Sequence, residues 1–350
     1  MVNLLIALIV LTIVILIHEF GHFIVCKLSG VIVQEFAIGF GPKIFSIKGK
    51  ETEYSVRAFL IGGYVRPLGE DQEVDHPRAL NNAKVHKRIL MVLMGPVMNF
   101  VLAIVIMMGI AYFVGFGTNT IDKTEPNFPA HIAGIRPGDR IVEMDGNKVF
   151  VWDQVSFYLA VHNMLYKDKP LEVKIQRDGK EYKFYITPKY DPNTKRRLIG
   201  ISPRISKKNL VDSLYYSIFA TYAEIKETIY GVVLMLSGKV SGSEIMGPVG
   251  IVKTIGQAAN AGFKQNFVSG LLNILWLMQL ISVNLGVINL IPFPALDGSR
   301  LVFYLYEAIA GKPFNREKEA LIHTIGFVLL LLLLVIVTFN DIKNIIMPGR

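Results

Sequence analysis

Residues 18–22 read His-Glu-Phe-Gly-His and place three ionisable side chains in an otherwise apolar stretch. On a helix, His18 and His22 are four residues apart and share one face, so their two imidazoles can bind one Zn²⁺. Glu19 projects near the same face and can take a proton from a zinc-bound water. Ionisable groups in an apolar span are costly unless they are paired, metal-bound or beside a wet cavity. The pattern therefore predicts a zinc hydrolase site with Glu19 as general base; a structural polar cluster is the alternative.

A third zinc ligand should come from another apolar segment, because a catalytic zinc usually has three protein ligands and one water. The third long apolar block ends in Asn-Leu-Ile-Pro-Phe-Pro-Ala-Leu-Asp-Gly at residues 289–298. Pro292 and Pro294 break the helix and free backbone groups that only a protein-lined cavity can tolerate. Asp297 is therefore the candidate third ligand, and a position in a cytoplasmic boundary loop is the alternative interpretation of this residue.

Long apolar blocks dominate this chain of 350 residues, of which 52% are hydrophobic and only 19% are charged. A soluble domain of this size needs more surface charge. Four blocks, residues 4–25, 89–116, 271–291 and 321–339, are long enough to cross a hydrocarbon core of about 30 Å as helices. The sequence thus predicts a multi-pass α-helical membrane protein with four transmembrane helices, a membrane-associated β-hairpin or sheet, and one extracytoplasmic α+β domain.

The apolar blocks divide the chain into eight predicted segments. These are a first transmembrane segment (1–26), a cytoplasmic loop with the β-element (27–88), a second transmembrane segment (89–116), the extracytoplasmic domain (117–208), an interfacial helical segment (209–268), a third transmembrane segment (269–298), a cytoplasmic loop (299–320), and a fourth transmembrane segment with the C-terminus (321–350). Within 213–236, the central charges of Glu224, Lys226 and Glu227 favour a helix lying on the membrane over a fifth crossing.

Alternation of polar and apolar residues marks the predicted strands. Residues 53–59 alternate, and residues 62–65 continue the pattern after a predicted turn, which indicates a hairpin or small sheet beside the first helix. In the extracytoplasmic domain, residues 171–175 and 182–187 alternate, and residues 152–162 form the candidate helix.

The formal net charge of +9 comes largely from Lys and Arg beside the predicted spans. Because ten of these residues lie between the first two blocks, the positive-inside rule places that connection in the cytoplasm, and both termini and the 117–208 domain outside. No nucleic-acid partner is expected. Cys26 is the only cysteine, so no intrachain disulfide can form. His76 and His86 are expected to be loop residues rather than ligands, and the first helix is expected to be retained.

The two-part metal pattern, HEFGH in the first span and NLIPFPALDG in a late one, resembles the site-2 protease family of intramembrane zinc metalloproteases. The likeness is greatest to the bacterial regulator-of-sigma-E protease group, and it extends to Gly-Pro-Val-Met-Asn-Phe at residues 95–100 and Gly-Pro-Val-Gly-Ile at residues 247–251. The resemblance implies that His18, His22 and Asp297 hold one Zn²⁺ and that Glu19 is the general base.

Less specific roles are also implied by the resemblance. Asn99 fits a position that supports the substrate carbonyl or its oxyanion. A further set fits substrate-handling segments: Asn289, Pro292 and Pro294 near the third ligand, and Tyr54, Gly62 and Gly63 in a membrane-dipping β-element that holds substrate by strand addition. The outer domain resembles a PDZ module most clearly at residues 133–145; familiar members of the group carry two such modules, whereas this chain has room for one.

The expected reaction is hydrolysis of a peptide bond within the transmembrane segment of a single-pass membrane protein, in the cytoplasmic (inner) membrane of a bacterium. The resemblance implies anti-sigma factors or signal-peptide remnants as substrates, in the lipid bilayer, after an upstream site-1 protease has shortened them. Two rival functions stay open. One is another membrane protease with the HExxH pattern, whose third ligand is a downstream glutamate, Glu224 or Glu227. The other is a non-enzymatic membrane adaptor acting through the PDZ-like domain.

Overall fold

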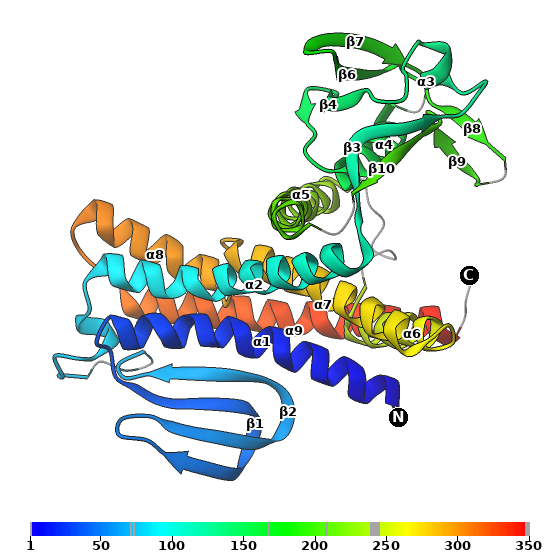
Figure 1. The fold of residues 1–350 in the computed structure, drawn as a ribbon. Coiled ribbons are helices and arrows are strands. Elements are labelled where there is room, and N and C mark those ends of the chain that lie inside the picture. The colour runs from blue at the N-terminus through cyan, green and yellow to red at the C-terminus, as the bar shows by residue number, and fades with distance from the viewer. Residues whose placement is uncertain are drawn as a thin grey trace. The chain divides into compact units, whose positions relative to one another are not determined.

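The computed structural model describes residues 2–70, 72, 74–166, 168–192, 194–206, 209–238 and 246–346. The chain forms two compact units, one made of Met1–Ile106 with Thr228–Arg350 and the other of Met107–Glu227. The first unit is mainly helical and carries a long β-ribbon, whereas the second contains a β-sheet with helices (Figure 1).

Four helices in the described part of the chain are long and apolar enough to cross a membrane: α1 (Val2–Leu28), α2 (Val85–Val114), α7 (Phe267–Leu290) and α9 (Arg316–Ile346). Their bounds differ from the predicted blocks by a few residues at either end. α5 (Leu210–Leu236) is not among the four. The segment predicted as interfacial, 209–268, contains α5 and a second helix, α6 (Pro248–Phe263); residues 239–245 between them lie outside the described residues.

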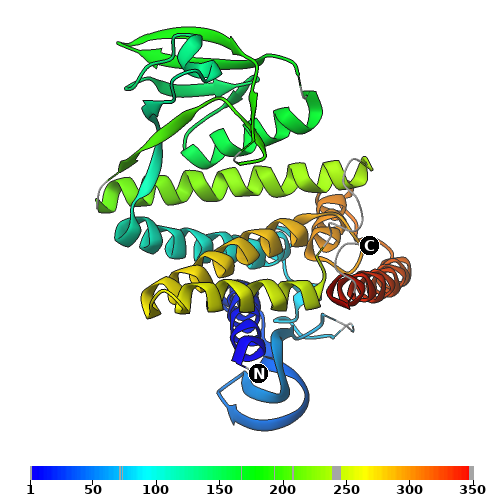
Figure 2. The same cartoon turned by 90° about the vertical axis from the view of Figure 1, so that its right-hand side faces the viewer.

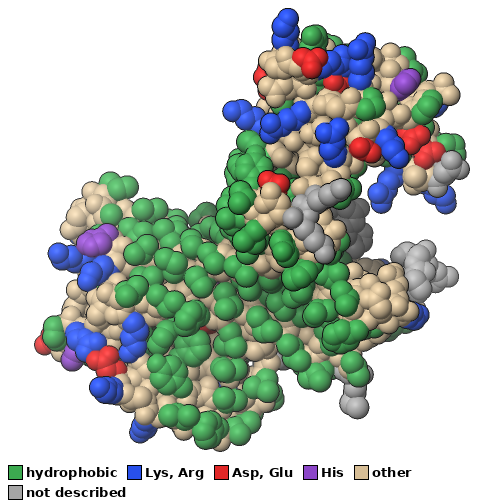
Figure 3. Space-filling model, in the orientation of Figure 1, with side chains coloured by type: hydrophobic (Ala, Val, Ile, Leu, Met, Phe, Trp, Pro, Cys, Tyr) green, Lys and Arg blue, Asp and Glu red, His purple; other side chains and the backbone are tan. Residues whose placement is uncertain are grey.

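Apolar side chains hold the helical unit together and also cover it. A buried cluster joins α1, α6 and α7 through Ala7, Val10, Val14, Ile255 and Leu277. Outward-facing leucines along α9, residues 331–334, remain 45–55% exposed. Figure 3 shows hydrophobic side chains spread over the surface of the helical unit, with charged side chains gathered at one end of it. Such a surface suits a lipid environment rather than water.

The β-ribbon consists of β1 (Val33–Lys48) and β2 (Glu53–Pro67), which pair antiparallel. β1 residues 35–38 pair both with residues 53–56 and with residues 63–66, so the ribbon folds back on itself. Figure 2 shows it as a curled band beside α1. The turn predicted between residues 59 and 62 is wrong: β2 runs through this stretch, and Gly62 bends it with a positive φ of 81°, which a glycine adopts without strain.

The second unit is built on a six-stranded sheet in which β10 (Ile201–Ser206), β3 (Phe116–Thr124), β4 (Arg140–Met144), β6 (Leu171–Arg177) and β7 (Lys180–Ile186) follow one another, and β5 (Asn147–Lys148) pairs with β4. α3 (Pro129–Ile132), α4 (Trp152–Tyr166) and the pair β8 (Lys189–Asp191) and β9 (Arg196–Leu198) complete it. The predicted helix and both predicted strands of this region are present. Its core includes Ile121, Ile141, Met144 and Ile175, all buried.

The connection after α7 differs from the prediction. The third transmembrane segment was expected to reach residue 298 with a loop over 299–320, but α7 ends at Leu290 and a further helix, α8, spans Asp297–Ala310. Pro292 ends α7 because it lacks an N–H and its ring would clash with the preceding turn. Asp297 is therefore the first residue of a new helix rather than part of the third span.

Candidate metal centre

His18 and His22 lie one turn apart on α1, as their spacing predicts. His18 is buried, and the two rings approach edge to face with centroids 4.8 Å apart. Their Nε2 atoms are 3.1 Å from each other. Two imidazole nitrogens this close on one helix face can form one half of a metal site.

Asp297 supplies the other half from the start of α8. Its Oδ2 lies 2.9 Å from Nε2 of His18 and 3.3 Å from Nε2 of His22. Gly298 allows this helix to begin so close to the end of α7, because a Cβ there would lie only 2.2 Å from the carbonyl oxygen of Ile291. The two prolines and this glycine thus bring Asp297 back against α1.

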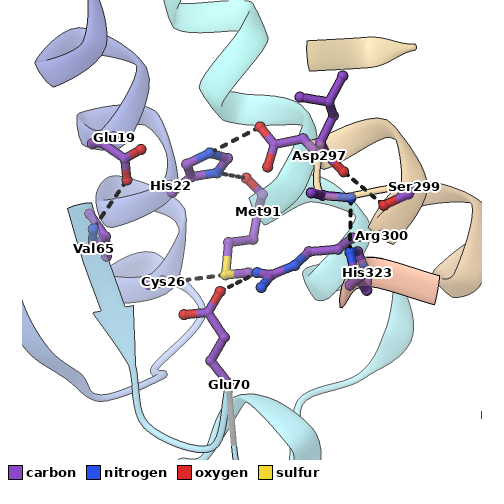
Figure 4. Close-up of polar contacts among 12 residues, drawn as sticks. Glu19, His22, Cys26, Val65, Glu70, Met91, Asp297, Ser299, Arg300 and His323 are labelled. Atoms are coloured by element: carbon purple, nitrogen blue, oxygen red, sulfur yellow. Dashed lines mark hydrogen bonds and ion pairs between the residues drawn. The ribbon is translucent and has the colours of Figure 1, made fainter. Parts of the chain in front are cut away.

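The three side chains fit a zinc ion. Nitrogen and oxygen ligands about 2.0–2.2 Å from zinc, at tetrahedral corners, lie about 3.3 Å apart. Nδ1 of His22 donates to the carbonyl oxygen of Met91 at 2.8 Å (Figure 4). In the neutral ring Nε2 then carries the lone pair, and it faces a carboxylate oxygen of Asp297. Two acceptors facing each other repel unless a cation or a proton lies between them. The donor set and its spacing therefore match a tetrahedral zinc site with one open position.

Glu19 lies in the same cavity, a space of about 750 Å³ whose walls include His18, His22 and Asp297. Its Oε2 accepts a hydrogen bond from the backbone N–H of Val65 at 3.1 Å, so β2 contacts the carboxylate directly (Figure 4). A carboxylate next to the two imidazoles, in a cavity large enough for an extended peptide segment, can accept a proton from a metal-bound water.

An ion pair that no sequence motif predicts lies at the edge of this cavity. Arg300 of α8 pairs with Glu70, which follows β2, and both side chains line the cavity (Figure 4). His323 of α9 accepts a hydrogen bond from the backbone N–H of Ala295 at 3.1 Å. Arg300 lies three residues after Asp297, about one turn along α8. This spacing is the one feature of the sequence that indicates that Arg300 lies near Asp297.

The residues with weaker predicted roles are distributed unevenly around the cavity. Asn289 and Gly63 line it, whereas Tyr54, Gly62, Pro292 and Pro294 do not. Tyr54 is 44% exposed and packs instead on Phe23 and Phe36.

Asn99 is fully buried behind the imidazoles, with Nδ2 3.3 Å from Nδ1 of His18. The predicted glutamate ligands of the rival protease type, Glu224 and Glu227, belong to α5 in the other compact unit. Among the described residues, the carboxylate that completes the group with His18 and His22 is that of Asp297.

The fold and this site together define a membrane protein with a zinc hydrolase centre, and comparison with known proteins gives its family. The model of peptidase family M50 matches residues 6–333, so the chain belongs to this family, the site-2 proteases. It is a zinc metalloprotease, and its metal is Zn²⁺.

Its relatives support this assignment over nearly the whole chain. A protein of Clostridium acetobutylicum that is named as a candidate zinc metalloprotease is 40% identical over 343 residues, which cover 97% of each chain. The zinc metalloprotease RasP of Geobacillus kaustophilus is 29% identical over 413 positions, covering 93% of this chain and 94% of the relative. RasP of Bacillus licheniformis is 30% identical, with 94% and 96% covered. Membership in a protease family contradicts the non-enzymatic adaptor.

Proposed function

We propose that this chain cleaves peptide bonds within the membrane-spanning segments of single-pass membrane proteins. The observation that carries the proposal is the convergence of His18, His22 and Asp297 around one point, beside Glu19, in a cavity between apolar helices. In this proposal His18, His22 and Asp297 hold the zinc. A site at this position can act on a bond that a soluble protease does not reach.

The chemistry divides between the metal and the chain. Zinc, when bound, supplies a Lewis acid and a water whose pKa is lowered toward neutrality. Glu19 takes the proton of that water and passes it to the leaving amine. The nearby Val65 N–H keeps the Glu19 carboxylate turned toward the cavity before substrate enters.

The ribbon offers a place for the substrate backbone. Residues 63–66 of β2 pair with β1 on one side, and the Val65 N–H points away from β1 toward the cavity. A helical substrate must unwind locally before hydrolysis, because its carbonyl groups are otherwise hydrogen-bonded within the helix. An extended segment can then add to this edge of β2, as in other complexes formed by strand addition. Gly63 and Asn289 also line the cavity.

The sheet unit is proposed to be a single extracytoplasmic PDZ-like module, with both chain termini outside and the 27–88 and 299–320 connections in the cytoplasm. The RasP alignment of 413 positions exceeds the 350 residues of this chain, so that relative has residues with no counterpart here. In this proposal the chain lies in the inner membrane of a bacterium, and its substrates are anti-sigma factors or signal-peptide remnants already shortened by an upstream protease.

The test is to map where cleavage occurs. The purified protein and its Glu19→Gln variant would be reconstituted in liposomes with a single-pass substrate that carries a short extracytoplasmic tail, and the products would be identified by mass spectrometry. We expect wild type alone to cut, within the apolar segment. Cleavage confined to a loop outside that segment would contradict the proposal and favour the rival protease type.

A further inference from the structure

We propose that one face of α2 positions the two zinc-binding imidazoles, through Met91, Gly95 and Asn99. This inference rests on the proposed zinc site and assigns it three supporting residues that touch neither metal nor substrate. The three residues are four apart along α2, so they lie on one face of the helix. His18 and His22 have the same spacing on α1, and the two faces meet.

Met91 fixes the proton on His22. Its carbonyl oxygen can only accept, so Nδ1 of His22 is the protonated nitrogen in their 2.8 Å contact. In the neutral ring the other nitrogen, Nε2, carries the lone pair, and it lies 3.3 Å from Oδ2 of Asp297. A second partner of this kind selects the tautomer of a metal-binding histidine and holds its ring in plane.

Gly95 provides the space into which both rings fit. A Cβ at this position would lie 2.4 Å from Nε2 of His22 and 2.8 Å from Cε1 of His18. Any larger residue must push the imidazoles away from each other and from Asp297. Gly21 of α1 has the matching role from the other side, since its Cβ would lie 2.3 Å from the carbonyl oxygen of Met94. The close approach of α1 and α2 at this level depends on both glycines.

Asn99 can accept a hydrogen bond from Nδ1–H of His18, as the Met91 carbonyl does from Nδ1–H of His22. When Nε2 of His18 binds a metal, its Nδ1 carries the proton and needs an acceptor. The Asn99 side chain lies 3.3 Å from Nδ1, and its Oδ1 has no hydrogen-bond partner among the described residues. The two ends of an amide have the same shape, so a half-turn places Oδ1 against Nδ1–H and satisfies both groups. The Ser282 hydroxyl donates to the Asn99 carbonyl at 2.8 Å and ties this part of α2 to α7.

This role differs from support of a substrate oxyanion, which the family resemblance implies for Asn99. An oxyanion partner has to face the reacting carbonyl, whereas Asn99 is fully buried with its amide against His18. The two roles separate experimentally, because a positioning residue changes zinc affinity and an oxyanion partner changes only the rate of cleavage.

The first test compares two substitutions of the same kind on the same helix. Gly95→Ala places a methyl group against the imidazoles, whereas Gly109→Ala, also in α2, meets no heavy atom of the described residues within 4 Å. Alanine suits a helix better than glycine at both positions. Zinc affinity would be measured by competition with a chromophoric chelator in detergent. We expect Gly95→Ala to bind zinc roughly 10- to 100-fold more weakly than wild type, and Gly109→Ala to match wild type.

The second test substitutes Asn99, and it tests the positioning role of α2 even if Gly95→Ala does not fold. Asn99→Leu keeps the shape but removes the acceptor, and we expect a zinc affinity roughly 10- to 100-fold lower. Asn99→Asp restores an acceptor for Nδ1–H, and we expect it to keep the wild-type affinity. If Asn99→Leu binds zinc like wild type and only its cleavage falls, the positioning role is wrong and the oxyanion role is favoured.

A His18→Ala variant separates failure of this inference from failure of the proposed site. Retention of wild-type zinc affinity in His18→Ala would overturn the proposed ligand set itself. Loss of zinc from His18→Ala, together with wild-type affinity in both Gly95→Ala and Asn99→Leu, would overturn only the role assigned to α2.

Discussion

Two carboxylates with low exposure, Glu35 in the ribbon and Asp297 at the metal centre, are compensated in opposite ways. Glu35 is 1% exposed and accepts hydrogen bonds from Ser55 at 2.6 Å, Arg57 at 2.7 Å and Tyr64 at 2.8 Å. Arg66 adds a cation at 3.4 Å. Protein donors thus complete this cluster, which leaves no position for a ligand.

Asp297 has no comparable set of donors. Its Oδ2 faces two imidazole nitrogens, and in the neutral His22 ring the nearer nitrogen carries a lone pair because Nδ1 holds the proton. The charge is balanced only when a cation or a proton enters the group. A carboxylate whose hydrogen bonds all come from protein donors therefore stabilises the fold. A carboxylate that faces imidazole nitrogens with lone pairs is instead a candidate metal ligand.

The largest expected effect comes from Glu19, the proposed general base. Glu19→Gln keeps the size of the side chain and an acceptor for the Val65 N–H, but it cannot take up a proton. We predict that cleavage of a single-pass substrate falls about 10²- to 10⁴-fold. Zinc content, measured in parallel, should equal that of wild type; a cleavage rate near wild type would remove Glu19 from the mechanism.

Glu35 should affect folding rather than chemistry. Glu35→Leu removes the acceptor of Ser55, Arg57 and Tyr64 together, and we predict a loss of about 3 kcal/mol in the free energy of unfolding. The matched control on the same ribbon is Glu53→Gln, which breaks the more exposed pair with Lys43. That change should have little effect on the free energy of unfolding, because solvent screens an exposed ion pair. Chemical unfolding in detergent and the rate of proteolysis in the ribbon measure both, and zinc content should not change in either variant.

A smaller effect is expected from acid. Burial by itself raises the pKa of Glu35, but the hydrogen bonds from Ser55, Arg57 and Tyr64 outweigh it and lower the pKa from 4.5 to about 2. Because the folded-state pKa is depressed, the stabilisation is complete above about pH 4.5 and is lost as the pH falls toward 2.

The acid effect of Glu35 has to be separated from that of other carboxylates, and Glu35→Gln provides the reference. The pH dependence of ribbon proteolysis between pH 4.5 and 2 should be steeper in wild type than in Glu35→Gln. Equal slopes in the two proteins would contradict the account of this cluster.

Much of the metal site was predictable because its chemistry has a local signature. HEFGH predicts two ligands and a base on one helix turn, and two prolines followed by Asp-Gly indicate a broken helix with an acid beside it. The four spans follow from hydropathy alone. Asp297 was placed in the wrong element because a single sequence does not show that the chain resumes a helix, α8, directly after the prolines.

The parts that were missed depend on contacts between distant segments. In the sequence Glu35 looks like an ordinary strand residue. Its partners Ser55, Arg57 and Tyr64 lie on β2, and only the pairing of β1 with β2 brings them next to it. The four-residue spacing of Met91, Gly95 and Asn99 is visible in the sequence. Only the packing of α1 on α2 shows that these residues lie against His18 and His22.

If Asp297 completes a zinc site with His18 and His22, its replacement should empty that site, and the zinc content of Asp297→Asn measures this. Wild type, Asp297→Asn and the control Glu35→Gln would be purified at one buffered free-zinc concentration that just saturates wild type, and their metal would be counted by mass spectrometry. We predict about one zinc per chain in wild type and in Glu35→Gln, and almost none in Asp297→Asn. Asp297→Asn that folds and still holds one zinc per chain would show that Asp297 is not a zinc ligand.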